Sequence, residues 1–191
     1  MHRVQIAHDD PAGIEAAARR ERQRIFAALD SDWLLTAHHR NDQAETLLLQ
    51  LLRGAGPKGL AAMPEAQHRL GWRAGQLRPL LGVGRIELLA YARAHGLDWV
   101  EDDSNADVRF RRNALRQQVL PLLDAHFPAV TVTLARAAAL QADAAELLDD
   151  LAQLDAMEAV RDDRLDCAAL IALIRPRARN LLRYFIESRG H

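Results

Sequence analysis

The sequence predicts an α/β fold followed by an all-helical part. The first of two observations is a helix-then-strand pattern near the start of the chain. Residues 12–29 are alanine-rich with apolar residues at helical spacing, and the short apolar run Trp33-Leu-Leu-Thr-Ala37 that follows is typical of a buried strand. The second is a change of character after Asp107, where helical patterns succeed one another without a strand pattern: 111–126, 128–155 and 176–188.

Between these parts the pattern alternates. A second helix is expected to start near Asn41 and to stop at Gly54, with one buried stripe formed by Ala44, Leu47, Leu48, Leu51 and Leu52. A weaker extended segment over 69–79 and a helix over 85–95 follow, and residues 97–100 are a candidate for one more short strand. We place a boundary near residue 105, which gives an α/β part over 1–105 and a helical part over 106–191.

Composition excludes several classes of protein. Among 191 residues Cys167 is the only cysteine, which excludes a disulfide framework and an all-cysteine zinc site. No apolar run approaches the roughly 18 residues of a membrane span, so we expect a cytoplasmic protein with no membrane partner. The net charge is only −1, but residues 53–116 carry 11 Lys+Arg against 7 Asp+Glu. An anionic partner is therefore expected to meet this middle part.

The densest polar cluster lies between the predicted strand and the second helix. His38 precedes the helix, and Asp42 and Glu45 fall in its first turn, on one side and away from the apolar stripe. A histidine and two carboxylates at the carboxyl end of a strand can hold a magnesium ion and the phosphates it bridges. In the alternative interpretation, Asn41 caps the helix and the two acids only complement its dipole.

Two further clusters carry positive charge. Arg53 and Lys58 flank the glycines of Arg53-Gly-Ala-Gly-Pro-Lys-Gly59, where the backbone can approach a phosphate. Arg109, Arg112 and Arg116 are spaced i, i+3 and i+7, which gives one basic ridge if the helix extends back to Arg109. A ridge of this kind is either a ligand surface or a solvated face.

Together these clusters resemble the tRNA(Ile)-lysidine synthetases of the PP-loop N-type ATP pyrophosphatase superfamily. His38-His-Arg-Asn-Asp-Gln-Ala-Glu-Thr46 is similar to the family's HHxDDQxET signature, and Arg53-Gly-Ala-Gly-Pro-Lys-Gly-Leu-Ala-Ala-Met63 to its RGxGxxGLxxM stretch. Arg78-Pro-Leu-Leu81 and the segment from Asp103-Ser-Asn105 through Arg112-Asn-Ala-Leu-Arg116 follow in the family's order.

The resemblance implies the second half of a Rossmann-like (adenine nucleotide alpha hydrolase-like) domain, followed by the family's central helical domain. It implies a carbon–nitrogen ligase of tRNA modification that uses ATP and Mg²⁺. ATP adenylates the C2 oxygen of the wobble cytidine of tRNA(Ile), and the ε-amino group of L-lysine then displaces AMP to give lysidine. The resemblance is also compatible with a homodimer.

The resemblance also implies roles for individual residues. The catalytic residues would be His38, Asp42, Glu45 and Arg19, with Arg19 and His38 binding the nucleotide and Asp42 and Glu45 near the metal. The residues expected to contact tRNA are Arg53, Lys58, Arg78, Arg109, Arg112 and Arg116.

Two departures from the family qualify these roles. Asn41 replaces the first aspartate of the family's Asp-Asp pair, and no counterpart of the family's SGGxDS loop occurs in the chain. We therefore expect a fragment that is inactive alone and lacks the amino-terminal ATP loop and the carboxyl-terminal domains. Two other functions stay open: a non-catalytic tRNA-binding module, and an ATP pyrophosphatase-type enzyme that modifies tRNA differently.

Overall fold

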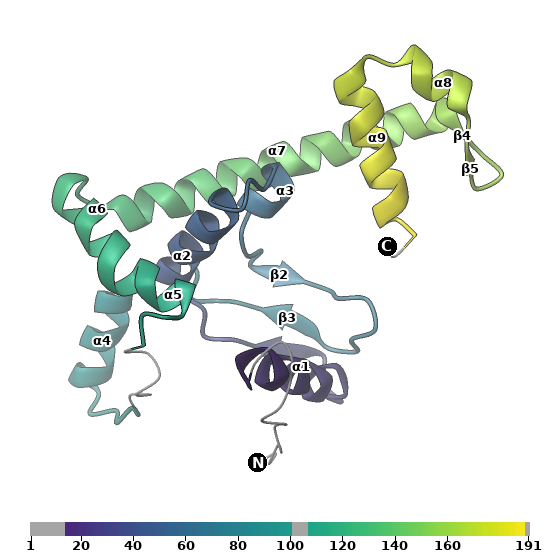
Figure 1. Cartoon of the computed structure of the whole chain (residues 1–191). Helices are drawn as coiled ribbons and strands as arrows, with labels where there is room; N and C mark the ends of the chain where they lie inside the picture. The colour runs from purple at the N-terminus through teal and green to yellow at the C-terminus, as the bar shows by residue number, and fades with distance from the viewer. Residues whose placement is uncertain (1–13, 101–106, 190–191) are drawn as a thin grey trace. The chain divides into compact units, whose positions relative to one another are not determined.

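The computed structural model describes residues 14–100 and 107–189 (Figure 1). These residues fall into two compact units. The sheet unit comprises 14–43 and 63–100, and the helical unit comprises 44–62 and 107–189. Helix α2 (Arg40–Leu51) begins in the sheet unit and continues into the helical unit. The predicted domain boundary near residue 105 stays a prediction, since it lies outside the described residues, as does the Asp103-Ser-Asn105 turn.

The sheet unit places the ends of two parallel strands side by side. Strand β1 (Trp33–Leu35) pairs in parallel with β3 (Gly75–Leu77), and β2 (Ala66–Gln67) pairs antiparallel with the other side of β3. Thr36 extends the ladder by donating its backbone N–H to the carbonyl of Leu77 at 2.9 Å. The residues that follow β1 and β3 therefore lie side by side at the carboxyl-terminal ends of these strands, which is where ligands bind in open α/β folds.

Helices α1 (Ile14–Ala27) and α4 (Arg85–Ala94) confirm the predicted helices of this unit. The expectation that β1 is buried is wrong, because Leu35 is 62% exposed and Trp33 is also exposed. The reason is its position in the sheet, because β1 is an edge strand of the three-stranded sheet. The predicted strand over 97–100 is also wrong, since these residues are irregular and exposed.

Helix α2 buries less of its predicted apolar stripe than the spacing suggests. Ala44 and Leu47 are buried, but Leu51 is exposed and Leu52 is 74% exposed. The helix ends at Leu51, three residues before the predicted stop, and the turn that follows it closes at Gly54, whose φ of +72° favours glycine. The short helix α3 (Pro57–Leu60) follows, with proline at its first turn.

The helical unit is built around one long helix. The segment α5 (Arg111–Ala114), the π-helical turn η2 (Leu115–Val119) and α6 (Leu120–His126) lead into α7 (Val130–Ala159). Helix α7 packs against α3 and against α9 (Arg175–Glu187).

The expectation that this part is all-helical is wrong in one place. A two-stranded hairpin, β4 (Val160–Arg161) with β5 (Arg164–Leu165), follows α7 and leads to α8 (Cys167–Ala172). Asp162 and Asp163 form its two-residue loop, both with positive φ, as such hairpins require. None of the helices within 14–100 and 107–189 combines the length and the apolar character needed to cross a membrane.

Candidate active site

The segment between β1 and α2 holds the predicted catalytic histidine. The Nδ1 atom of His38 lies 3.0 Å from Oγ1 of Thr36, so the residue directly after β1 fixes the imidazole ring. Gln76 on β3 donates its side-chain amide to the same Oγ1 at 3.3 Å. Thr36, directly after β1, and Gln76, on β3, thus each contribute one polar side chain that supports His38.

Asp42 is held by the start of its own helix. Its Oδ2 accepts the backbone N–H of His39 at 2.9 Å, and Nδ1 of His39 lies 3.5 Å from the same oxygen. A side chain at the third helical position that accepts from the residue before the helix is one half of a capping box. The carboxylate is buried, although the sequence placed it on a polar face.

The alternative interpretation, in which Asn41 caps α2, is wrong. Asn41 lies inside α2, and its Oδ1 accepts the backbone N–H of Arg85, the first residue of α4, at 3.0 Å. Its neighbour Arg40 contacts the same region, donating to the carbonyl of Gly82 at 3.0 Å and to Glu87 at 2.7 Å. The start of α2 therefore positions the start of α4.

Gln43 contacts Met63, the last residue of the glycine-rich motif, within the sheet unit. Its Nε2 donates to the carbonyl of Met63 at 2.7 Å, and its Oε1 accepts the N–H of Met63 at 2.9 Å. This two-point contact satisfies both backbone groups of the methionine that ends the second motif. The sequence analysis did not single out Gln43, although its place in the signature between Asp42 and Glu45 was a usable signal.

Glu45 is fully buried, with 0% of its surface exposed, and both carboxylate oxygens bind arginines. Arg112 Nε lies 2.6 Å from Oε2, while Arg116 reaches Oε1 through Nε at 2.7 Å and Oε2 through Nη2 at 3.0 Å. These arginines lie on α5 and on η2, and π-helical turns are often found at functional sites. Two guanidinium groups therefore share one buried carboxylate.

This geometry does not fit Glu45 as a metal ligand. Both of its oxygens are occupied by guanidinium groups, and Asp42 is engaged by its own helix start. Within 14–100 and 107–189 no three His, Cys, Asp or Glu side chains are grouped as a metal would require. The described residues therefore lack the oxygen-rich shell that magnesium prefers, and the assignment of Asp42 and Glu45 to the metal has no support in them.

The predicted basic ridge is not continuous. Helix α5 begins at Arg111, so Arg109 precedes it and instead binds Asp107 with Nε at 3.0 Å and Nη2 at 2.7 Å. Those contacts hold the pKa of Asp107 below the usual value of an aspartate. They hold the pKa of Arg109 above the usual value of an arginine. Of the other predicted cations, Arg53 and Arg19 lie exposed.

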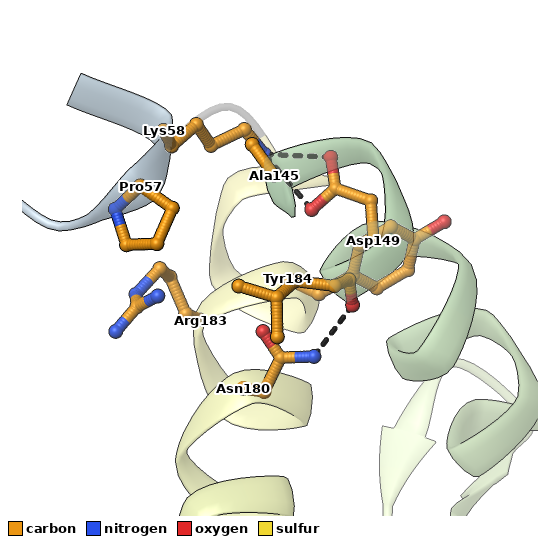
Figure 2. Close-up of a pocket in the computed structure, with 8 residues that line it drawn as sticks. Pro57, Lys58, Ala145, Asp149, Asn180, Arg183 and Tyr184 are labelled. Atoms are coloured by element: carbon orange, nitrogen blue, oxygen red, sulfur yellow. Dashed lines mark hydrogen bonds and ion pairs between the residues drawn. The ribbon is translucent and has the colours of Figure 1, made fainter. Parts of the chain in front are cut away.

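Lys58 is part of the packing of the helical unit. Its Nζ lies 2.9 Å from Oδ2 of Asp149 on α7 and 2.7 Å from Oε2 of Glu187 on α9. Burial alone would lower its pKa, but the hydrogen bonds from Glu187 and Asp149 outweigh that effect and raise it. Figure 2 shows Lys58 above Asp149, and Asn180 of α9 donating to a carbonyl of α7. The hollow between them is about 10 Å³, enough for about one water molecule, so it is not a ligand pocket.

Arg78 is also no surface residue, since only 2% of it is exposed. Its Nη1 donates to the carbonyl of Pro64 at 2.6 Å and its Nη2 to Oε1 of Gln76 at 2.7 Å. Gln76 is the residue that supports Thr36 and His38, so Arg78 belongs to the hydrogen-bond network of the predicted catalytic histidine. Period-two alternation along β3, which puts Gln76 and Arg78 on one face, was the signal that could have found this.

Comparison with known proteins places these motifs in a family. The PP-loop domain model matches residues 1–123. Three relatives are named tRNA(Ile)-lysidine synthase: those of Azoarcus sp. (50% identical over 96% of this chain), Coxiella burnetii (47% over 98%) and Pseudomonas syringae pv. tomato (54% over 82%). The chain spans 41%, 42% and 35% of these relatives' lengths. The resemblance stated from the motifs is thereby confirmed.

Proposed function

The chain belongs to the PP-loop domain family, and on this premise we propose that it is the central part of a tRNA(Ile)-lysidine synthase. The proposed reaction joins the ε-amino group of lysine to C2 of the wobble cytidine in two steps. The C2 oxygen first attacks the α-phosphorus of ATP and pyrophosphate leaves. The lysine amine then attacks C2, and AMP leaves with the oxygen.

The observation that carries the proposal is the contact of Glu45 with Arg112 and Arg116. It joins the histidine-containing motif to the Arg112-Asn-Ala-Leu-Arg116 motif, and both motifs independently resemble the same family. In a buried setting the carboxylate fixes the orientation of two guanidinium groups, a group whose planar N–H donors suit phosphate oxygens. We propose that Arg112 and Arg116 stabilise the charge that develops on the phosphate groups.

The residues of the sheet unit take the complementary roles. His38 would accept or donate the proton exchanged when the amine attacks, with Thr36 and Gln76 fixing its ring. Asp42 would maintain the start of α2, which directly follows His38 and His39. Arg19 remains a candidate nucleotide contact, and Arg53, Arg109, Arg112 and Arg116 remain candidate tRNA contacts. Lys58 and Arg78 are withdrawn from that set, because one is paired with carboxylates and the other is buried.

The test is to restore the segments that this chain does not share with its relatives. The amino- and carboxyl-terminal segments of the Azoarcus relative, fused to this chain, should give lysine incorporation into tRNA(Ile) and release of pyrophosphate. Glu45→Gln and His38→Ala should abolish both, and Arg73→Gln, which alters an exposed arginine paired with Asp30, should leave them unchanged. If the fused protein binds tRNA but never releases pyrophosphate, the chain is a non-catalytic tRNA-binding module. Pyrophosphate release with another tRNA would make it a different tRNA-modifying enzyme.

A further inference from the structure

A chain of hydrogen bonds links the buried Arg78 to the predicted catalytic histidine, and its direction is fixed at the arginine. A guanidinium group has N–H donors but no acceptor. Nη2 of Arg78 lies 2.7 Å from the side-chain amide of Gln76, so the atom of Gln76 that faces it is the oxygen Oε1. The amide of Gln76 therefore turns its NH2 group, which only donates, to the other side.

Burial makes this end of the chain permanent. Arg78 is 2% exposed and Gln76 is 4% exposed, and Nη1 of Arg78 donates to the carbonyl of Pro64 at 2.6 Å. Burial lowers the pKa of Arg78, and the charge of Arg69 lowers it further, yet an arginine stays protonated in proteins. Gln76 cannot turn over, because its NH2 group would then face the donors of the guanidinium group.

The NH2 group of Gln76 faces Thr36. Nε2 of Gln76 donates to Oγ1 of Thr36 at 3.3 Å, so the threonine oxygen is an acceptor on this side. A hydroxyl also has one hydrogen to donate, and two acceptors lie near it: Nδ1 of His38 at 3.0 Å and the carbonyl of Leu77 at 3.5 Å. The choice between them decides the tautomer of His38, because Nδ1 either accepts this hydrogen or carries one of its own.

The distances favour Nδ1 of His38 as the acceptor. Hydrogen bonds between two oxygen atoms are roughly 2.5–3.0 Å long, so the separation from Leu77 is too long for a strong bond. The carbonyl of Leu77 already accepts the backbone N–H of Thr36 at 2.9 Å. Each group of the chain then donates to the next, from guanidinium to amide to hydroxyl to imidazole, and hydrogen bonds that run in one direction polarise one another.

We infer that this chain holds neutral His38 in the tautomer with its hydrogen on Nε2, and that Gln76 and Arg78 are positioning residues for it. In this tautomer the ring meets a substrate as an N–H donor, because its one lone pair accepts from Thr36. Of the two roles left open for His38, the network selects donation, to an oxygen atom that gains negative charge. This choice of role rests on the proposed function, whereas the tautomer is a property of the chain itself.

Nuclear magnetic resonance of the 191-residue chain, with nitrogen-15 in its histidines, reads the tautomer. At about pH 8 a histidine with an ordinary pKa is neutral, and the couplings between ring hydrogens and ring nitrogens show which nitrogen carries the hydrogen. His38→Gln identifies the signals of His38 among the eight histidines. His95 is the internal reference, because its Nδ1 lies 2.9 Å from the carbonyl of Tyr91, which only accepts. We expect hydrogen on Nε2 of His38 and on Nδ1 of His95.

Gln76→Glu is the decisive variant, because it reverses the chain. The carboxylate stays ionised beside Arg78 and keeps that contact, but its second oxygen only accepts. The hydroxyl of Thr36 then donates to this oxygen, and Nδ1 of His38 keeps its contact only by carrying the hydrogen. We expect the hydrogen of His38 to move from Nε2 to Nδ1 while His95 does not change. Hydrogen on Nδ1 in the parent chain, or on Nε2 in a folded Gln76→Glu chain, would overturn the inference.

Thr36→Val gives a second test that places no charge in the interior. The valine keeps the shape of the threonine and removes its hydroxyl. A ring nitrogen that accepts a hydrogen bond resonates at lower frequency than one that does not, so the signal of Nδ1 of His38 should move to higher frequency. A nitrogen that carries the hydrogen and loses its acceptor moves the opposite way, and that sign would contradict the inference.

The fused enzyme separates this inference from the proposed function. Gln76→Glu should lower the kcat of lysidine formation roughly 100-fold or more, the usual effect of losing one donor to a developing negative charge. Gln153→Glu, the same change at an exposed position of α7, should alter neither kcat nor the tautomer. An unchanged kcat with a switched tautomer would overturn the donor role. If the fused parent makes no lysidine while the tautomer switches as expected, the proposed function fails and the tautomer is supported.

Discussion

Asn41 accepts the backbone N–H of Arg85 at 3.0 Å, across 44 positions of the chain, and so caps α4 from within α2. The related family carries an aspartate at this position in the signature. Both side chains present an oxygen that can accept this hydrogen bond, and an aspartate would also face the positive end of the α4 dipole. The replacement of the family's aspartate by Asn41 therefore preserves the hydrogen bond to the backbone of Arg85.

Substitution of Asn41 should separate this cap from the chemistry. Asn41→Ala should lower the free energy of unfolding by about 1 kcal/mol, because the first N–H of α4 loses its acceptor. Asn41→Asp should stay within about 0.5 kcal/mol of the parent, since the acceptor is kept. Urea denaturation of the three chains checks this. Equal stability of the alanine and aspartate variants would mean that the contact contributes nothing.

Removal of Glu45 should cost far more than the loss of a first-turn acid. Glu45→Ala leaves Arg112 and Arg116 without their shared counter-ion, and breaking a buried pair costs about 3–5 kcal/mol. We expect the lower end, because both arginines reach solvent. Asp42→Ala on the same helix is the matched control and should cost about 1 kcal/mol. A Glu45→Ala midpoint within two degrees of the parent would contradict the buried-pair interpretation.

Lys58 gives a dependence of stability on pH. Its pKa is raised in the folded chain, so its contribution is complete below the unfolded value near 10.4 and is lost as the pH rises through the folded value. Lys58→Met should therefore be less stable than the parent at pH 8, by about 1 kcal/mol or less for a half-exposed pair. The difference should shrink above about pH 10.5. Urea unfolding of both chains at pH 8, 10 and 11 checks it, and a constant difference would exclude the ion pairs as its source.

Binding of RNA should distinguish Arg53 from Lys58, although both flank the same glycine-rich turn. Arg53 is exposed, whereas the charge of Lys58 is already matched by two carboxylates. Arg53→Gln should reduce the salt dependence of tRNA affinity by about one phosphate contact, a slope change of roughly 0.7–0.9. Lys58→Gln should leave the slope unchanged. Filter binding between 50 and 200 mM salt, as an approximate range, measures both. A larger effect at Lys58 would reverse the assignment.

Much of the local structure was predictable from the sequence. Alanine-rich and periodic segments such as those of α1 and α4 become helices because spacing and propensity act within a few residues. The motif around His38, Asp42 and Glu45 was likewise visible, because its residue types are those of the related family. The irregular conformation of residues 97–100 was not predictable from the sequence, since a short apolar run becomes a strand only when another strand pairs with it.

The partners of the motif residues were decided by the tertiary structure alone. Glu45 binds arginines 67 and 71 positions away, and Asn41 caps a helix 44 positions away. Arg78 is buried because β3 lies between two other strands, a fact of sheet order. The sequence by itself determined which side chains can carry charge and on which local elements they lie. Which charges neutralise one another and which remain available for an anion depends on long-range packing, because burial and distance set the strength of each pair.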